Sequence, residues 1–335
     1  MIIVRAPLRI PIGGGGTDLP SYYSLHEGEW TSAAIDKYIY IAVNKRFGNS
    51  LRISYSQTEE VENPDDVQHP IVREALKLLG ITRGLEIVSI ADVPSHTGLG
   101  TSGSFTVALL TALHAYLKNT ENRDIPSRRE IAEQACYIAM NLLKEPSGKQ
   151  DEYIAAYGGL NSFYASKEGE VKVEPLFAQK IFPETLRELE NKLLMFYTGI
   201  RRDSRVALQV QDDATKRNEQ EMIENLHRVK EIGREIKKSI IDKNFSRFGE
   251  LLDVHWQEKI KRQGTSNPQI NDWYKIAKDN GALGGKIMGA GGGGFFLFYC
   301  DENRDKLRKV LAEQGFMEKP FRFDLEGVKV IADFI

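Results

Sequence analysis

The apolar residues of this chain follow two different periods along its length. In some stretches they alternate with polar residues or run unbroken for a few positions, which is typical of strands; in others they recur every three or four residues, which predicts helices. Strands are predicted at 2–10, 31–34, 38–45, 51–55, 85–90, 193–197, 295–299, 321–324 and 327–331. Helices are predicted at 69–79, 105–117, 127 to near Pro146, 203–262 with breaks, 268–281 and 302–315.

The segments between these elements show weaker patterns. Residues 58–66 are acidic and polar, which predicts a surface loop, and 166–175 are expected to form a charged hairpin. Residues 146–153 place a lysine and two carboxylates after a helix-ending proline, and they fit either a solvated loop or a functional one. The many Lys and Glu residues of 203–262 are expected on solvent-exposed helix faces.

Composition narrows the class of protein. The chain has 335 residues, enough for two domains, and its 41% hydrophobic and 27% charged residues are ordinary for a globular protein. Its net charge of −2 argues against a general nucleic-acid binder. No apolar run approaches the roughly 18 residues of a membrane span, and the N-terminal sequence breaks too early for a signal peptide. The two cysteines, Cys136 and Cys300, are far apart in the sequence, which suggests reduced thiols. We therefore expect a soluble, cytoplasmic protein with no membrane or nucleic-acid partner.

The most informative segment is 94–104, which is rich in glycine and hydroxyl residues and stands between a predicted strand and a predicted helix. Glycine lets backbone amides approach a ligand closely, and a helix start adds unpaired N–H groups that attract phosphate. The alternative is an ordinary helix start after a flexible turn. Its glycine spacing is neither that of a dinucleotide-binding loop nor that of a Walker loop.

Two further glycine-rich segments flank the chain's middle. Gly13 to Gly16 precede Thr17 and Asp18, which predicts either backbone packed against a ligand, with Asp18 accepting hydrogen bonds, or a loose surface loop. Arg9 shares a strand face with Arg5, so either could reach anionic oxygen, or both could be solvated. Residues 284–294 contain a third dense run of glycines beside a buried strand, which argues against a linker.

These three segments resemble the motifs of the GHMP kinases, which include galactokinase, homoserine kinase, mevalonate kinase and phosphomevalonate kinase. Residues 94–104 are similar to the phosphate loop of that family, Pro-x-x-x-Gly-Leu-Gly-Ser-Ser-Ala-Ala. Residues 286–294 are similar to its third motif, which supports the nucleotide loop. Arg9 precedes Asp18 by nine residues, as the matching Arg and Asp do in the first motif of the family's sugar kinases. The resemblance covers essentially the whole chain.

The resemblance implies an α+β fold of two domains. An N-terminal domain related to a ribosomal-protein domain would span 1–165, and a ferredoxin-like C-terminal domain would span 190–335, with substrate and ATP between them. Residues 5–9, 13–18 and 148–151 are similar to those of D-glycero-D-manno-heptose 7-phosphate kinases. These enzymes transfer a phosphoryl group from ATP to the anomeric oxygen and form the 1,7-bisphosphate. A fucose or galactose kinase, or a non-catalytic sugar- or nucleotide-binding regulator, stays open as an alternative.

The resemblance also implies roles for individual residues. Asp151 would accept or orient the proton of the sugar hydroxyl, and Arg9 would stabilise charge on the transferring group. ATP and Mg²⁺ are the expected cofactors, with the Ser102 hydroxyl on the metal. The implied ATP-binding residues are Pro94, Gly98, Leu99, Gly100, Thr101, Ser102, Gly103 and Ser104. The implied substrate-binding residues are Gly15, Gly16, Thr17, Asp18, Lys149, Arg201, Arg202, Gly291 and Gly292.

Two departures from the family pattern, and the need to bind a phosphate, bear on the substrate and the metal. Gly15 and Gly16 stand where galactokinases carry Glu and His, which leaves room for a bulkier or differently posed sugar. Ala139 stands where family members often carry a Glu that helps to hold Mg²⁺, so another carboxylate, the phosphates with Ser102 alone, or weak activity are the open explanations. A 7-phosphate needs cations, and the candidates are Lys149, Arg201, Arg202 and Arg205, of which the three arginines could equally lie at a solvated helix start.

Overall fold

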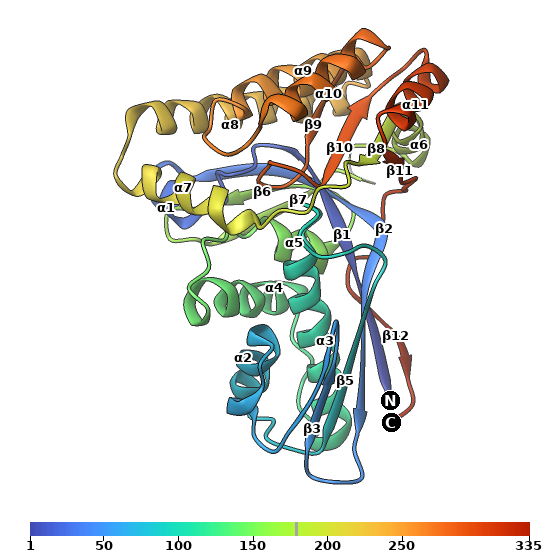
Figure 1. Ribbon diagram of the computed structural model, residues 1–335. Coiled ribbons are helices and arrows are strands. Elements are labelled where there is room, and N and C mark those ends of the chain that lie inside the picture. Colours follow the sequence, from blue (N-terminus) through green and yellow to red (C-terminus); the bar gives the residue numbers. More distant parts are fainter. Residues whose placement is uncertain (178–179) are drawn as a thin grey trace.

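Two sheets organise the computed structural model, which describes residues 1–177 and 180–335 (Figure 1). Within these residues the larger sheet has eight strands, with the path β12-β1-β2-β5-β3-β4 and with β6 and β7 paired beside β2. Its strands are β1 (Ile2–Gly13), β2 (Gly28–Lys45), β3 (Leu51–Ser54), β4 (Thr58–Val61), β5 (Leu85–Ala91), β6 (Leu160–Ala165), β7 (Val171–Pro175) and β12 (Lys329–Asp333). The helices that accompany this sheet are α1 (Pro20–His26), α2 (Pro70–Leu79), α3 (Thr101–Glu121), α4 (Arg128–Tyr137) and α5 (Gln150–Tyr157), with a π-helical turn at Ile138–Leu142.

The smaller sheet has four antiparallel strands in the order β11-β8-β10-β9. These strands are β8 (Leu193–Tyr197), β9 (Gly284–Ile287), β10 (Phe295–Tyr299) and β11 (Met317–Glu318). The helices of this part are α6 (Pro183–Lys192), α7 (Ser204–Lys216), α8 (Gln220–Ile241), α9 (Phe245–Lys259), α10 (Pro268–Asp279) and α11 (Arg304–Glu313). From β8 onward the chain runs strand, helices, two strands, helix, strand, which is the ferredoxin-like order. The predicted α+β class is confirmed.

Helix α3 forms the centre of the first part. It packs against β1 and β2 on one side and against α4 and α5 on the other. Val107, Leu110 and Leu113 are fully buried, and apolar residues surround the helix on all sides, as expected of a helix enclosed by its own domain. This burial fixes the position of the start of α3, where segment 94–104 ends.

Strand β2 shows a difference from the predicted pattern. The sequence predicts two strands separated by a turn at Asp36 and Lys37, whereas β2 continues unbroken for 18 residues. Its register with β1 shifts between Pro7 and Leu8, so the two extra residues form a bulge rather than a turn. The polar pair is therefore accommodated within the sheet.

Other local predictions were also wrong. Residues 58–66 include the short edge strand β4, whose charged side chains suit an exposed sheet edge. Residues 146–153, for which both a solvated and a functional loop stayed open, begin α5 at Gln150, and the buried Tyr153 and Ile154 anchor that helix. The strand predicted at 321–324 is reduced to an isolated bridge between Phe323 and Ile35.

The end of the chain returns to the first sheet, where β12 pairs antiparallel with β1 (Figure 1). The last residues of the expected domain 190–335 thus lie on the sheet of the expected domain 1–165, and this division stays a prediction. Among the described residues, no helix combines the length and apolar character needed to cross a bilayer.

Candidate active site

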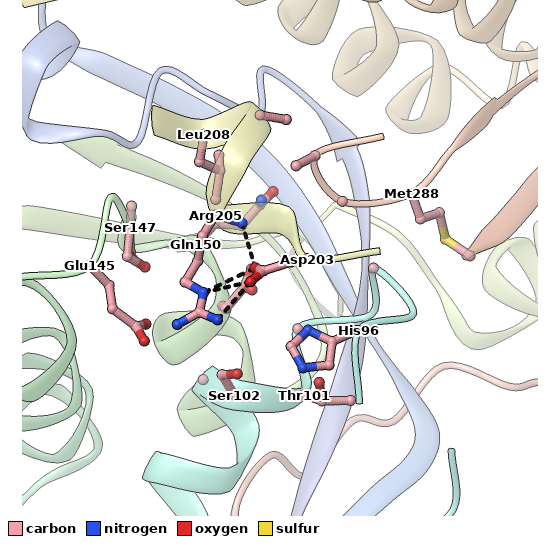
Figure 2. A pocket seen from close by; sticks show the side chains of 18 of the residues that line it. His96, Thr101, Ser102, Glu145, Ser147, Gln150, Asp203, Arg205, Leu208 and Met288 are labelled. Atoms are coloured by element: carbon pink, nitrogen blue, oxygen red, sulfur yellow. Dashed lines mark hydrogen bonds and ion pairs between the residues drawn. The ribbon is translucent and has the colours of Figure 1, made fainter. Parts of the chain in front are cut away.

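A cavity of about 940 Å³ is lined by residues of both parts of the chain. The first part contributes the end of β1, segment 94–103 and the start of α5; the second contributes α7, α9 and the glycine-rich segment after β9. Figure 2 shows Thr101, Ser102, Glu145 and Arg205 among the side chains around this cavity. The three glycine-rich segments of the sequence therefore meet in one place.

Segment 94–104 presents backbone to the cavity. Gly98 and Gly100 have φ angles of 82° and 77°, and Gly100 precedes the first turn of α3 with no side-chain cap. The first N–H groups of α3 are therefore unpaired within the helix, an arrangement that binds phosphate. A Cβ on Gly98 would lie 2.5 Å from the carbonyl oxygen of Met288, so glycine is required where this segment meets the third glycine-rich one.

Two residues of this segment face the protein interior instead. Leu99 is fully buried, and its carbonyl accepts a 3.0 Å hydrogen bond from the backbone N–H of Arg9. The Ser104 hydroxyl donates to the carbonyl of Pro7 at 2.7 Å. Neither lines the cavity, whereas Pro94, Gly98, Gly100, Thr101, Ser102 and Gly103 do. Leu99 and Ser104 therefore attach the segment to β1 and do not contact the cavity.

Arg9 and Asp151 form a two-pronged ion pair at the cavity wall. Nε and Nη2 of Arg9 donate to the two carboxylate oxygens of Asp151 at 2.7 and 2.9 Å, and Nη1 donates to the carbonyl of Gly98 at 2.6 Å. Arg9 is 5% exposed, and Asp151 stands in the first turn of α5. Such forked, charge-assisted bonds fix the carboxylate in orientation as well as position.

Asp18 lies beside this pair and is held by backbone groups. Its carboxylate accepts hydrogen bonds from the N–H of Gly16 at 2.8 Å and from the N–H of Gln150 at 3.2 Å. Burial raises the pKa of Asp18, as does the nearby Asp151 carboxylate, although the backbone hydrogen bonds oppose these effects. A Cβ on Gly148 would collide with the Asp18 carboxylate, so this glycine is needed for the contact.

Three residues expected to bind substrate do not face the cavity. Thr17 is fully buried, and its hydroxyl is engaged by the carbonyls of Gly14 and Glu29. Lys149 donates to both carboxylate oxygens of Glu133, at 2.8 and 2.9 Å, and to the carbonyl of Gly169 at 2.7 Å. Arg201 is exposed to solvent and is not among the lining residues. None of these three side chains is therefore placed to contact a substrate in the cavity.

The remaining expected residues from the second part divide into two groups. Arg202 and Gly291 line the cavity, but Nη1 of Arg202 already donates to the carbonyl of Gly264 at 2.7 Å. Gly292 stands behind Arg202, where a Cβ would strike the guanidinium. Arg205 also lines the cavity, and it forms an ion pair with Asp203 at 2.6 Å (Figure 2).

Sequence reasoning missed a group of cations on α9. His255, Lys259 and Arg262 line the cavity with Lys286 of β9, although the charged residues of 203–262 were expected to be solvated. His255 and Lys259 lie four residues apart on one face of α9, and Arg262 follows three residues later in the turn after the helix. This spacing of basic residues is the signal that could have found them. Burial lowers the pKa of Lys286 to about 7 and that of Arg262 to about 10. Burial, followed by the neighbouring cations, lowers the pKa of His255 and Lys259 well below their usual ranges.

The opposite end of the cavity is apolar and aromatic. His69 stacks on Phe105 with ring centroids 4.8 Å apart, and Tyr55 meets His69 edge-on at 4.7 Å. These three residues line the cavity together with Ile39 and Pro70. Such a surface suits a flat, apolar ring.

The metal-binding capacity of the cavity is limited. Among the residues that the structure describes, no three or more His, Cys, Asp or Glu side chains gather as a metal cluster. Ser102, in the exposed first turn of α3, and the half-buried Glu145 both line the cavity, as does Ala139. One hydroxyl and one carboxylate fit Mg²⁺, because this ion commonly keeps waters and phosphate oxygens as its other ligands.

Comparisons with known proteins agree on one family. The model for the GHMP kinases N-terminal domain matches residues 70–159, and the model for the C-terminal domain matches residues 222–315. The D-glycero-alpha-D-manno-heptose 7-phosphate kinase of Campylobacter jejuni is 30% identical over 98% of each chain. The L-fucokinase/L-fucose-1-P guanylyltransferase of Bacteroides fragilis is 26% identical over 93% of this chain and 36% of its own length.

Solved structures support the same fold. A D-glycero-D-manno-heptose 1-phosphate kinase from Bacteroides thetaiotaomicron superposes with a TM-score of 0.78 at 21% identity and covers 100% of both chains. Lactococcus lactis galactokinase complexed with galactose gives a TM-score of 0.73 at 16% identity, with 98% of this chain and 94% of that chain covered. With both family domains matched and a relative aligned along almost its entire length, this chain belongs to the GHMP kinases and is an ATP-dependent phosphotransferase with an alcohol group as acceptor.

Proposed function

We propose that the protein is a sugar kinase that transfers the γ-phosphoryl group of ATP to the anomeric hydroxyl of D-glycero-D-manno-heptose 7-phosphate, giving the 1,7-bisphosphate. The observation that carries the proposal is the forked Arg9–Asp151 pair beside the start of α3, because it sets a carboxylate and a cation where phosphate is expected. The full-length similarity to a heptose 7-phosphate kinase supports the choice of acceptor.

Asp151 is the proposed acceptor of the hydroxyl proton. The forked contact with Arg9 fixes the orientation of this carboxylate at the cavity wall. Arg9 also lies beside the carbonyl of Gly98, so its charge reaches the segment expected to hold the phosphates. Positioning and charge stabilisation of this kind supply most of the catalysis in phosphoryl transfer.

ATP is proposed to extend between two surfaces of the cavity. Its phosphates would lie over the unpaired N–H groups at the start of α3, while the adenine would lie against Tyr55, His69 and Phe105. The first surface offers the positive end of a helix, and the second offers aromatic faces for stacking. Both surfaces belong to the first part of the chain.

Mg²⁺ is proposed to be held by Ser102 and Glu145 together with phosphate oxygens, so that Glu145 takes the place of the Glu that the family often carries at the position of Ala139. The ion would supply charge neutralisation to the phosphates. Burial raises the pKa of Glu145, and the nearby Arg205 opposes this effect, so a bound cation would favour the ionised carboxylate.

The sugar is proposed to lie between Asp151 and the backbone of Gly15 and Gly16, with the Asp18 carboxylate accepting hydrogen bonds from its hydroxyls. The first segment carries no side chain at these two positions, so the acceptor can approach the main chain closely. A fucose kinase is the second candidate, supported by the similarity to a fucokinase along 93% of this chain. The buried cations of α9 favour a phosphorylated acceptor over a neutral one.

A coupled assay of ADP release across heptose 7-phosphate, fucose, galactose and mevalonate tests the proposal. We expect the highest kcat/KM for heptose 7-phosphate, and ³¹P NMR of the product should show a second phosphate on the anomeric oxygen. A higher kcat/KM for fucose would reject the heptose assignment in favour of the second candidate. A product phosphorylated at any other hydroxyl would reject the proposed site of transfer.

A further inference from the structure

The α9 side of the cavity carries more positive charge than its neighbours balance. Arg262 is a cation at neutral pH, and the carboxylate acting on it from within the cavity is Asp18. Burial lowers the pKa values of the neighbouring Lys259 and Lys286, so a bound anion would favour their protonated forms. Glu258 also attracts Arg262, but its carboxylate is already paired with Arg228 and Lys261. The charges on this side therefore favour an anionic ligand.

Several nitrogen atoms on this side lack a hydrogen-bond partner. Nη2 of Arg262 and both ring nitrogens of His255 are buried and unpaired among residues 1–177 and 180–335. The Lys286 ammonium, which has three hydrogens to donate, has one acceptor among the same residues, the carbonyl of Ile12 at 2.7 Å. Buried donors are nearly always paired in folded proteins, and the oxygens of a phosphate would accept from Nη2 of Arg262, from the free hydrogens of Lys286 and from the single N–H of a neutral His255.

The rest of Arg262 is fixed in place. Its Nε donates to the side-chain oxygen of Asn225 at 2.6 Å, and its Nη1 donates to that of Gln211 at 2.9 Å. Gln211 in turn donates to the carbonyl of Gly16 at 3.1 Å. The guanidinium is thus oriented in advance, with one nitrogen left for a ligand, beside the segment where the acceptor is proposed to lie.

Arg262 lies beside the first glycine-rich segment, at Gly16, and not at the surface proposed for the ATP phosphates. The phosphate-binding segment meets the second part of the chain at Met288, where a Cβ on Gly98 would touch its carbonyl. Lys286 and Arg262 instead contact the region of Ile12 and Gly16, at the end of β1. The cavity thus offers one anion site at the start of α3 and another at α9.

We propose that Arg262, supported by Lys286 and His255, binds the phosphate at the far end of the acceptor sugar. The inference rests on the function proposed above, because it requires a phosphorylated acceptor. Arg262 thereby takes the role of phosphosugar recognition that the sequence suggested for Lys149 and Arg201, neither of which lines the cavity. The acceptor then spans the cavity, with its reacting hydroxyl at Asp151 and its phosphate at Arg262.

The test compares Arg262→Gln with Lys275→Gln, at a lysine of α10 that is exposed, does not line the cavity and lies in no proposed contact. Losing a charge-assisted hydrogen bond should raise the KM for heptose 7-phosphate by about 10- to 100-fold in Arg262→Gln, with the KM for ATP unchanged. Lys275→Gln should leave both KM values unchanged. Arg262→Lys, which keeps the charge but loses the planar fork, should give an intermediate KM for heptose 7-phosphate.

The outcomes separate the inference from the function on which it rests. Wild-type protein that shows no preference for heptose 7-phosphate over unphosphorylated heptose would overturn both. A clear wild-type preference together with an unchanged phosphosugar KM in Arg262→Gln would overturn the inference alone. If Arg262→Gln fails to fold, as a thermal melt would show, Arg262→Lys decides: an unchanged phosphosugar KM in that variant also overturns it.

Discussion

Two sides of the same cavity, one around Arg9 and Asp151 and the other around Arg262 and His255, differ in how their charges are satisfied. On one side, every nitrogen of the Arg9 guanidinium has an acceptor, two of them on Asp151. On the other, the Arg262 guanidinium keeps a buried nitrogen without a partner, and His255 keeps two, among the residues that the structure describes. A side whose charges are already paired is arranged for reaction, whereas a side with unpaired donors is arranged for a ligand.

Glycines explain how the first side is built. A Cβ on Gly103 would lie 2.7 Å from the Cβ of Asp151, so only glycine lets α3 and α5 approach closely enough to present this carboxylate. A Cβ on Gly100 would likewise lie 3.1 Å from a carboxylate oxygen of Asp151. The second side instead relies on side-chain hydrogen bonds, since Asn225 and Gln211 hold the Arg262 guanidinium in its orientation.

The largest expected effect is on the paired side. Asp151→Asn should lower kcat by about 10²- to 10⁴-fold, because it removes the proton acceptor and keeps the shape of the side chain. The KM for ATP should change little, since the start of α3 is untouched. Steady-state kinetics with the preferred acceptor make the measurement. Near-full turnover by a correctly folded variant would show that another group accepts the proton.

A second substitution tests whether Lys149 binds the substrate or only stabilises the fold. Its ammonium is 7% exposed and is paired with Glu133, a carboxylate that is 41% exposed. Lys149→Met should therefore lower the free energy of unfolding by about 1–3 kcal/mol and leave the KM for heptose 7-phosphate unchanged. Urea denaturation and steady-state kinetics give the two values. A raised phosphosugar KM with unchanged stability would restore the substrate-binding role that the sequence suggests.

The paired side could be anticipated from the sequence because its residues sit in short motifs. Segment 94–104, Arg9 and Asp151 are close to glycines or at fixed spacings, and the three motifs do converge on one cavity. Regular apolar periods likewise located the long elements, including α3 and β10. Local patterns of this kind depend on neighbouring residues, which a sequence displays directly.

The other side could not be anticipated in this way. Whether a lysine is solvated or buried depends on which helix face packs against the rest of the chain. The spacing of His255, Lys259 and Arg262 indicates that they lie together, but it does not indicate that their face is buried. Lys149 shows the reverse error, since it lies within a motif yet turns toward Glu133. The strand β4 was missed because four residues rich in charge form a strand only when β3 lies beside them.

A third, smaller effect concerns the metal. Glu145→Gln should raise the Mg²⁺ concentration needed for half-maximal activity by about tenfold, because a neutral amide replaces one charged ligand. Glu168→Gln, at an exposed carboxylate outside the cavity, is the matched control and should change nothing. If both variants show the wild-type Mg²⁺ dependence, the ion is held without Glu145, by Ser102 and the phosphates alone.

The smallest expected effect concerns the pH dependence of stability that the buried Lys286 produces. Burial lowers the pKa of Lys286 from 10.5 to about 7, so between these values the unfolded chain binds a proton that the folded chain does not. The loss of unfolding free energy caused by this lysine is therefore largest below pH 7 and decreases as the pH rises toward 10.5. Stability consequently increases with pH across this window. Lys286→Met should remove that contribution, so the gap in unfolding free energy between variant and wild type should shrink by about 1 kcal/mol from pH 7 to pH 8. Urea denaturation at both pH values gives the gap directly. A gap that stays constant would mean that Lys286 keeps its proton throughout, and that the charge on this side of the cavity is balanced in the folded protein after all.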